Sequence, residues 1–300
     1  MAVDGEAAKA LGELARTRWE SAGGAPLPAP GQGETLWQED LEPQFRNVSL
    51  GIARTRGAFD KHEDIRENER LFLDLIRTAR HSIYAENQYF ASRKIAEAIA
   101  ERLKEPDGPE FVLVNPCTAN GWLEEEVMGA ARSELMRSLA QVDRHRRFRI
   151  YTPVNQAGED IYVHAKITIV DGRIIRVGSS NMNNRSMGLD SECDLLIDAA
   201  HPGNDEAGPM IEAIRADLMA EHLGVDPAEV QRVLEETGSL IRTVESLRGQ
   251  GRTLKPFTPP ELNELEKKIA HSQTLDPERP EELFEPLTKR RLLRRLPRPV

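Results

Sequence analysis

Hydrophobic positions along the chain follow two spacings, one typical of helices and one typical of strands. A compact apolar run predicts a strand at 111–116, and further strands are expected at 47–55, 148–154 and 193–199. Residues 81–90 predict a short strand that leads into a loop. Apolar positions at helical spacing predict helices at 63–80, 93–104 (with Ser92 as the N-cap), 123–142, about 205–223 and about 226–248. Strands that alternate with helices in this way indicate the α/β class, as an α-β-α sandwich with a mixed β-sheet.

A tight turn joins one further pair of strands. Segments 164–171 and 173–181 are apolar runs that meet at Asp171-Gly172. An Asp-Gly pair between two apolar runs predicts a β-hairpin, because the turn needs positive φ angles that these two residues tolerate. The hairpin contributes antiparallel strands, and the predicted sheet is therefore mixed.

Both ends of the chain depart from this alternation. Residues 1–22 predict an amphipathic helix with one apolar face, formed by Ala8, Leu11, Leu14, Ala15 and Trp19. Residues 23–44 are rich in Gly and Pro, as linkers are. Residues 251–300 hold eight of the nineteen prolines and predict an extended or partly disordered tail with one short helix at 260–270. The main domain is therefore expected at 45–200 and a set of C-terminal helices at 201–250.

Composition narrows the class of protein. The chain has 300 residues, of which 39% are hydrophobic, and a net charge of −10, which argues against a protein that wraps nucleic acid. No apolar run approaches the roughly 20 residues of a membrane-spanning helix. The N-terminus also lacks the apolar segment of a secretory signal, so a cytoplasmic location is predicted. The two cysteines, Cys117 and Cys193, exclude a disulfide framework and do not indicate a metal site.

Charge is distributed unevenly along the chain. The segment Lys289–Arg298 carries six basic residues, no acidic residue and three interleaved leucines. Such a segment can anchor a protein to an anionic membrane surface, at about 1 kcal/mol per basic residue close to the lipid. The alternative is a solvated end, and the sequence leaves both open. A peripheral membrane location therefore stands beside a purely cytoplasmic one.

The strongest chemical pattern lies on the predicted hairpin. His164 and Lys166 are two residues apart, so on a strand both side chains project from one face. The returning strand ends at Ser179, with Asn181 just beyond, and the hairpin brings both back beside His164 and Lys166. Lysine neutralises phosphate charge, Ser and Asn donate to non-bridging oxygens, and His attacks phosphorus or carries the proton. The pattern predicts a phosphodiester pocket.

Two carboxylates extend this candidate catalytic set. Glu192 lies at the start of the next strand and can hold the imidazole of His164 in one tautomer. Asp171 belongs to the same stretch of sequence as His164 and Lys166. Its place at the hairpin turn, away from the strand end that carries His164, favours a structural role over a catalytic one. Both residues are kept as candidates.

The candidate residues match the pattern H-x-K-x4-D-x6-G-S-x-N at every fixed position, and this pattern resembles the HKD motif of the phospholipase D superfamily. IYAENQYF at 83–90 and NNRSMGLDSE at 183–192 resemble segments near the second HKD motif of true phospholipases D. Over residues 45–200 the chain resembles the C-terminal half of a bacterial phospholipase D or transphosphatidylase, which implies one phospholipase D-like half-domain. The resemblance implies that Glu86, Asn87 and Gln88 bind substrate, with an ordinary hydrogen-bonded loop as the alternative.

The resemblance also implies a mechanism and a second half. Phospholipases D bring two HKD motifs to one site, where one His forms a phosphohistidine and the other handles protons, without a metal or cofactor. His164 holds the second-motif position, which implies the acid and base role. None of the other histidines begins H-x-K, so the half is expected to pair with itself or with a separate N-terminal half. Residues 1–22 are expected to belong to the end of that missing half.

The expected function is cleavage or exchange of a phospholipid headgroup, such as conversion of a phosphatidylcholine-like lipid to phosphatidic acid and an alcohol. Three alternatives stay open. The first is a nuclease or other phosphodiesterase of the superfamily acting as a homodimer, which the acidic charge disfavours. The second is a cardiolipin-synthase-like transferase, which the lack of a membrane-spanning run disfavours. The third is an inactive half that only binds.

Overall fold

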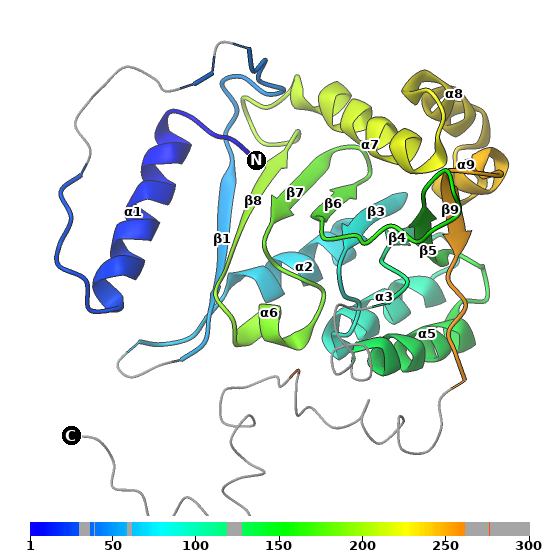
Figure 1. The fold of residues 1–300 in the computed structure, drawn as a ribbon, viewed down its shortest axis with the longest axis horizontal. Coiled ribbons are helices and arrows are strands. Elements are labelled where there is room, and N and C mark those ends of the chain that lie inside the picture. The colour runs from blue at the N-terminus through cyan, green and yellow to red at the C-terminus, as the bar shows by residue number, and fades with distance from the viewer. Residues whose placement is uncertain (30–36, 39, 59–61, 119–127, 262–275, 277–300) are drawn as a thin grey trace, which may run out of the picture.

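A computed structural model describes residues 1–29, 37–38, 40–58, 62–118, 128–261 and 276 (Figure 1). In this part of the chain, nine strands form one mixed sheet in the order β2-β1-β8-β7-β6-β3-β4-β5-β9. In chain order the strands are β1 (Gly51–Arg56), β2 (Ile65–Arg66), β3 (Ser82–Asn87), β4 (Glu110–Val114), β5 (Phe148–Val154), β6 (Lys166–Val170), β7 (Ile174–Gly178), β8 (Glu192–Asp198) and β9 (Thr253–Pro256). Strands β3, β4 and β5 are parallel, and all other pairs are antiparallel.

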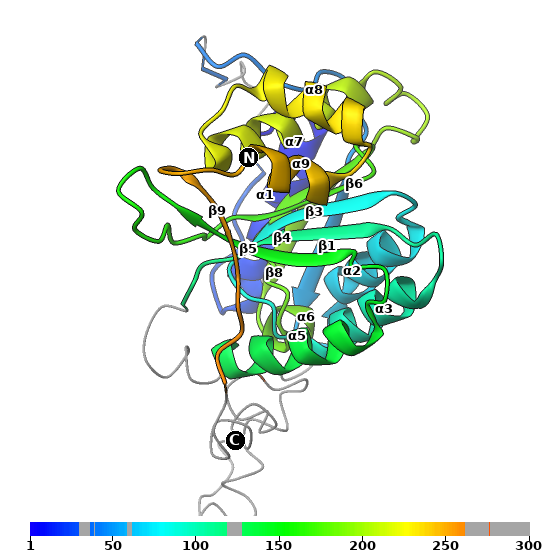
Figure 2. The same cartoon turned by 90° about the vertical axis from the view of Figure 1, so that its right-hand side faces the viewer.

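Helices cover both faces of this sheet (Figure 2). One face carries α2 (Glu67–Thr78), α3 (Arg93–Lys104), α5 (Ala130–Val142) and the short α6 (Asn184–Gly188). The other face carries α7 (Ala207–Leu223), α8 (Pro227–Thr237) and α9 (Leu240–Leu247). The predicted α/β class, an α-β-α sandwich with a mixed sheet, is therefore confirmed.

The central strands explain why the core has two halves. Along β4, Phe111 and Leu113 pack into the core beneath α2, α3 and α5, whereas Val112 and Val114 pack beneath α7 and α9. Successive side chains of a strand point to opposite faces, so an uninterrupted apolar run such as FVLV suits a strand that is buried on both sides. Residues 110–114 accordingly lie in the middle of the molecule.

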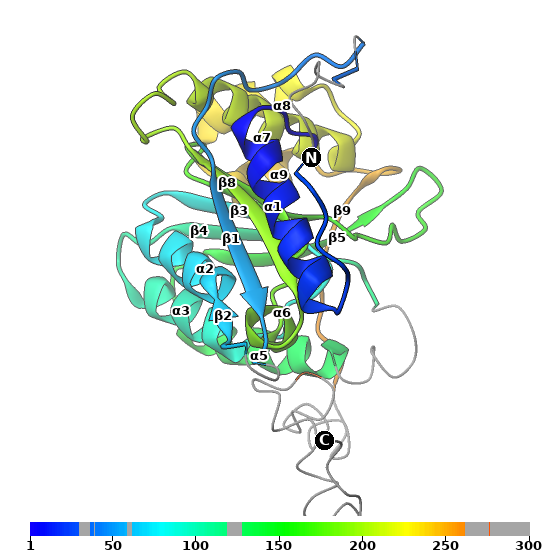
Figure 3. The same ribbon diagram turned by 90° about the vertical axis from the view of Figure 1, so that its left-hand side faces the viewer.

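Helix α1 (Glu6–Ser21) lies beside the β1 edge of the sheet (Figures 1 and 3). None of its residues is buried. Its contact with the domain includes a hydrogen bond of 2.8 Å from Arg18 Nη1 to Ser191 Oγ. The predicted helix is present, and its assignment to a missing half remains a prediction.

Several element bounds differ from those expected, for local reasons. The single helix expected at 226–248 is divided into α8 and α9, because Gly238 adopts a φ of 61° and Ser239 then caps α9 by accepting a hydrogen bond from the amide of Arg242. Helix α6 was not predicted. Strand β9 comes from the segment expected as an extended tail and pairs with β5. The helix expected at 260–270 falls almost wholly outside the described residues, as do Lys289–Arg298 and the first residues of the helix expected at 123–142.

The predicted hairpin is formed by β6 and β7, and its turn is tied to the start of β3. Asp171 and Gly172 adopt φ angles of 54° and 65°. The carboxylate of Asp171 accepts hydrogen bonds of 2.8 Å from three successive backbone amides, those of Arg80, His81 and Ser82. Asp171 therefore lies at the opposite end of β6 from Lys166 and aligns the hairpin with β3.

Candidate active site

The candidate site lies at one edge of the sheet, where β3 ends, β6 begins and β7 ends. Asn87 pairs with Lys166 across β3 and β6, and Ile167 pairs with Val177 across β6 and β7. Continuing the second register by one residue puts Gly178 opposite Lys166. The segment that follows β7 therefore returns beside the segment that precedes β6, as the hairpin pattern predicted.

Lys166 is held by two oxygen atoms at this edge. Its Nζ donates to Gln88 Oε1 at 2.9 Å and to the backbone carbonyl of His164 at 2.8 Å. Burial lowers the pKa of Lys166 from 10.5 to about 8, the nearby Glu192 carboxylate opposes this shift, and Arg176 adds to it. The ammonium is thus partly desolvated, which strengthens its attraction for an anion.

His164 is exposed, and an aromatic side chain lies against it. The rings of Tyr162 and His164 are stacked, with centroids 6.4 Å apart and an angle of 24° between their planes. The hydroxyl of Tyr162 accepts a hydrogen bond of 2.8 Å from Gln88 Nε2, which also contacts the hydroxyl of Tyr89 at 2.8 Å. Gln88 thus links the tyrosine beside His164 to the ammonium of Lys166.

Tyr162 was missed by the sequence analysis, although a signal for it exists. It precedes His164 by two residues, which would put both on one face if the strand expected at 164–171 extended back to Tyr162. In the structure β6 begins at Lys166, so Tyr162 and His164 lie in the segment before the strand. The side chain of Tyr162 is 41% exposed. Such a ring suits contact with an apolar or cationic part of a ligand.

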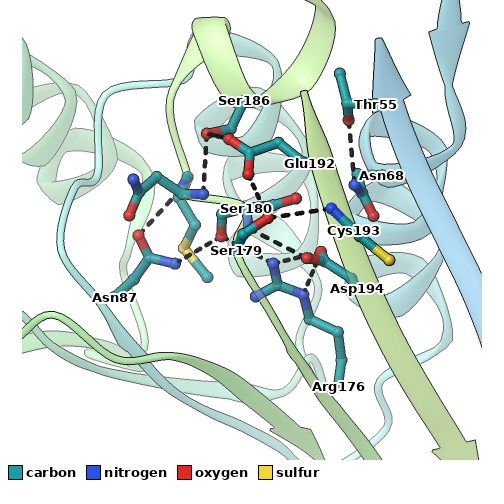
Figure 4. Close-up of polar contacts among 12 residues, drawn as sticks. Thr55, Asn68, Asn87, Arg176, Ser179, Ser180, Ser186, Glu192, Cys193 and Asp194 are labelled. Atoms are coloured by element: carbon teal, nitrogen blue, oxygen red, sulfur yellow. Dashed lines mark hydrogen bonds and ion pairs between the residues drawn. The ribbon is translucent and has the colours of Figure 1, made fainter. Parts of the chain in front are cut away.

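Glu192 engages two serine hydroxyls instead of the imidazole (Figure 4). Its Oε2 accepts from Ser179 Oγ at 2.5 Å and its Oε1 accepts from Ser186 Oγ at 2.7 Å. Burial raises the pKa of Glu192, and the two serine hydrogen bonds oppose this rise. The single hydroxyl proton of Ser179 is committed to Glu192, so Ser179 can donate to a phosphate oxygen only by leaving that carboxylate.

Asn181 differs from Ser179 in having an uncommitted side-chain group. Its Oδ1 is buried and has no hydrogen-bond partner among the described residues. Its backbone amide donates to Ser186 Oγ at 3.1 Å, so Ser186 joins Asn181 to Glu192. Ser186 was also missed, because the short α6 that carries it has too little periodicity to be predicted. An amide oxygen only accepts, so Asn181 Oδ1 suits a hydrogen-bond donor of a ligand, and any bond from Asn181 to a phosphate oxygen must come from its Nδ2.

The carboxylate of Asp276 holds the start of α6. It accepts hydrogen bonds of 2.9 Å and 2.7 Å from the backbone amides of Asn184 and Arg185. Burial raises the pKa of Asp276 to about 6, although both amide hydrogen bonds act in the opposite direction. A residue far along the chain therefore supports the helix that presents Ser186.

Of the three residues expected to bind substrate, Gln88 is the one whose side chain accepts a hydrogen bond from Lys166, although Asn87 pairs with Lys166 through the backbone register. Glu86 projects from the other face of the sheet, where it is 4% exposed, accepts from the hydroxyl of Tyr84 at 2.8 Å and lies 3.2 Å from His222 Nε2. Asn87 is fully buried, and its Oδ1 accepts from the amides of Tyr89 and Met182. The structure therefore places Glu86 and Asn87 in supporting contacts.

The described residues contain no group of three or more His, Cys, Asp or Glu side chains that could hold a metal ion. Cys117 and Cys193 are not joined in a disulfide. Within the same part of the chain, no helix is both long and apolar enough to cross a membrane.

The groups gathered at this edge of the sheet are an exposed imidazole, a partly desolvated ammonium and amide or hydroxyl groups, which together suit a phosphate ester.

Known proteins with related sequences point the same way. Residues 72–212 match the family described as cardiolipin synthase, PLD-like domain. Phospholipase D zeta 2 of Arabidopsis thaliana is 26% identical over 214 residues, which are 55% of this chain and 20% of that protein. Phospholipase D A of Dictyostelium discoideum is 31% identical over 199 residues, which are 52% of this chain and 16% of that protein. The chain thus matches a fifth or less of the length of these relatives.

Two solved structures are also similar. The phospholipase D family member Nuc from Salmonella typhimurium has a TM-score of 0.38 and 18% identity, covering 56% of this chain and 91% of that one. The phosphatidylserine synthase of Haemophilus influenzae has a TM-score of 0.43 and 16% identity, covering 66% of this chain and 47% of that one. The sequence matches carry the assignment: residues 72–212 of this chain match a PLD-like domain, and the wider chain is similar to phospholipases D.

Proposed function

We propose that this chain forms one half of a phospholipase D-type phosphodiesterase that hydrolyses or exchanges a phospholipid headgroup. The observation that carries the proposal is the convergence of His164, Lys166 and the Gly178–Asn181 segment at one edge of a sheet whose sequence matches phospholipases D. Lys166 and Asn181 bind the non-bridging phosphate oxygens, and Gln88 keeps the ammonium of Lys166 in place. Tyr162 contacts the headgroup.

The reaction proceeds in two balanced displacements. A histidine of a second half attacks phosphorus, a P–N bond forms and the P–O bond to the headgroup breaks, while His164 gives its proton to the leaving oxygen. Water or an alcohol then attacks phosphorus and loses its proton to His164, and the P–N bond breaks. The products are phosphatidic acid or a new phosphatidyl ester, and both histidines return to their starting states.

The second half is a second copy of this chain or a separate N-terminal half. A two-fold pair would bring two copies of His164 to one site, since the residue lies exposed at the sheet edge. The purified chain should then elute as a dimer in size-exclusion chromatography. A monomer that becomes active only when an N-terminal half is added would support the second arrangement.

The activity is tested with phosphatidylcholine vesicles, in the presence and absence of ethanol. Release of choline with formation of phosphatidic acid or phosphatidylethanol supports the proposal, and His164→Asn should abolish it. His81→Asn is the matched control, because His81 is an exposed histidine directly before β3. Lys166 pairs with Asn87 at the other end of β3, so His81 lies away from the site. Turnover of single-stranded DNA but not of lipid would instead favour the nuclease class.

Membrane contact belongs to the same proposal. The basic segment Lys289–Arg298 attracts anionic lipid and holds a cytoplasmic, acidic protein at its substrate. Deletion of residues 287–300 should reduce co-sedimentation with vesicles that contain phosphatidylserine. Equal binding by the shortened chain would remove this role from the segment.

A further inference from the structure

A buried ion pair lies directly beneath the candidate site (Figure 4). Arg176 of β7 and Asp194 of β8 have no exposed side-chain surface. Asp194 Oδ2 accepts from Arg176 Nε at 2.8 Å and from Arg176 Nη2 at 2.5 Å, and the guanidinium stacks on Phe72 with its carbon 4.4 Å from the ring centre. Neither residue belongs to the HKD pattern.

The ion pair binds the backbone amide and the backbone carbonyl of Ser180, which lies in the segment that follows β7. The backbone amide of Ser180 donates to Asp194 Oδ1 at 3.1 Å, and the backbone carbonyl of Ser180 accepts from Arg176 Nη2 at 2.8 Å. Ser180 is fully buried and stands between Ser179 and Asn181. The two hydrogen bonds to Ser180 therefore fix the backbone between Ser179 and Asn181, and so set the positions of both residues.

We propose that Arg176 and Asp194 are a positioning pair, which sets the placement of Ser179 and Asn181 around the phosphate by clamping Ser180. This inference rests on the proposed function for its effect on turnover, but the clamp itself can be measured without turnover.

The glycine of the pattern supports this assignment. A Cβ atom on Gly178 would lie 1.9 Å from Asp194 Oδ1 and 2.5 Å from Asp194 Cα. The side chain of Asp194 therefore approaches residue 178 closely because that residue has no side chain. The close approach of the Asp194 backbone requires glycine there as well, so the glycine is consistent with the clamp.

Stability alone is a weak explanation for the pair. Removing two charges from water costs several kcal/mol per ion. A protein in which hydrophobic residues of similar volume replace such a pair is often as stable as the original. One guanidinium nitrogen, Arg176 Nη1, is also buried without a hydrogen-bond partner among the described residues. The contacts of the pair with Ser180 provide a separate reason for burying these charges there.

Arg176 also acts on Lys166 through its charge. It is one of the causes that lower the pKa of Lys166. Replacing Arg176 alone by Met should therefore raise the pKa of Lys166. That change would move the alkaline limb of a pH profile, an effect that a loss of stability alone would not produce.

The test uses the full chain with Arg176→Met/Asp194→Leu, which removes both charges and the contacts of the pair with the amide and the carbonyl of Ser180. The weaker contact of 3.4 Å from Asn87 Nδ2 to that carbonyl remains. The matched control is Tyr151→Phe, which removes a partly buried hydrogen bond of 2.8 Å from Tyr151 on β5 to Glu245 on α9. Three quantities are measured: kcat and KM with phosphatidylcholine vesicles across pH, affinity for inorganic phosphate, and hydrogen exchange of the Ser180 amide by NMR.

The expected result is a fall in kcat of about 100-fold with a smaller change in KM, since a misplacement of about 1 Å has effects of that size. Exchange of the Ser180 amide should become faster and phosphate should bind more weakly, while Tyr151→Phe keeps wild-type values. Should the double variant fail to fold, Arg176→Lys keeps the charge but cannot reach both Asp194 and Ser180, and a fall of about tenfold in kcat is expected.

The outcomes separate the two proposals. Suppose that the wild-type chain turns over no lipid, yet binds phosphate and protects the Ser180 amide, and that the pair variants lose both properties. The positioning role of the pair is then supported, and the proposed function fails. If the pair variants keep wild-type kcat, phosphate affinity and Ser180 exchange, the positioning role is refuted, whatever the activity of the wild type.

Discussion

Raising the pH should lower the activity and raise the stability of this protein over the same range, because of Lys166. The side chain is partly buried between Gln88 Oε1 and the carbonyl of His164, and this burial brings its pKa to about 8. Above pH 8 the folded protein loses the ammonium that binds phosphate. kcat/KM should therefore fall about tenfold per pH unit between pH 8.5 and 10.

The stability effect has the opposite sign. Between pH 8 and 10.5 the unfolded chain keeps the proton on Lys166 while the folded protein has lost it, so the free energy of unfolding rises with pH. A shift from 10.5 to about 8 corresponds to a ceiling of about 3.4 kcal/mol at about 1.4 kcal/mol per pH unit. Solvent screening of the partly exposed side chain reduces the expected gain to about 1–2 kcal/mol.

Two measurements test this reasoning. Urea unfolding at pH 7.5 and pH 9.5 compares the wild type with Lys166→Met, and kcat/KM profiles compare the wild type with Lys166→Arg, whose guanidinium stays charged. Lys94→Met is the control, because Lys94 pairs with Glu69 on the helical layer. A kcat/KM that stays level to pH 10, or a limb near pH 8 that persists in Lys166→Arg, would refute the assignment.

Three further predictions concern the segments around the site. Gly178→Ala should lower the free energy of unfolding by about 3 kcal/mol in urea melts, because its Cβ would overlap the carboxylate of Asp194; an unchanged midpoint would contradict this. Asp276 has a pKa raised by burial to about 6, so the folded protein binds the extra proton and stability should fall by up to about 3 kcal/mol from pH 4 to 6.5. Urea melts of Asp276→Asn should lack that fall, and an identical pH dependence would exclude Asp276 as its source. Ser186→Ala removes a hydrogen bond that lowers the pKa of Glu192, so the carboxyl titration followed by carbon NMR should move to higher pH; no movement would count against the contact.

Elements with complete local signals were predicted closely. The helix at 93–104 and the strand at 148–154 have the bounds expected from the sequence. The start of the helix is defined locally, by its capping Ser92. The break between α8 and α9 was missed. Its cause is the left-handed backbone at Gly238, and a lone glycine in a helical pattern does not reveal that conformation.

The sequence by itself determined the class of fold and the hairpin, because side-chain period and turn chemistry are local properties. Strand β6 begins only at Lys166, so His164 lies just before it and the common face of these two residues stays a prediction. Only the tertiary structure decided which residues meet them. Gln88 reaches Lys166 across 78 residues of chain, and Asn87 reaches the carbonyl of Ser180 across 93. Such contacts depend on which strands become neighbours and in which register, so no spacing along the chain encodes them. The same reason explains why Glu86, adjacent to Asn87 in sequence, faces the opposite layer of the protein.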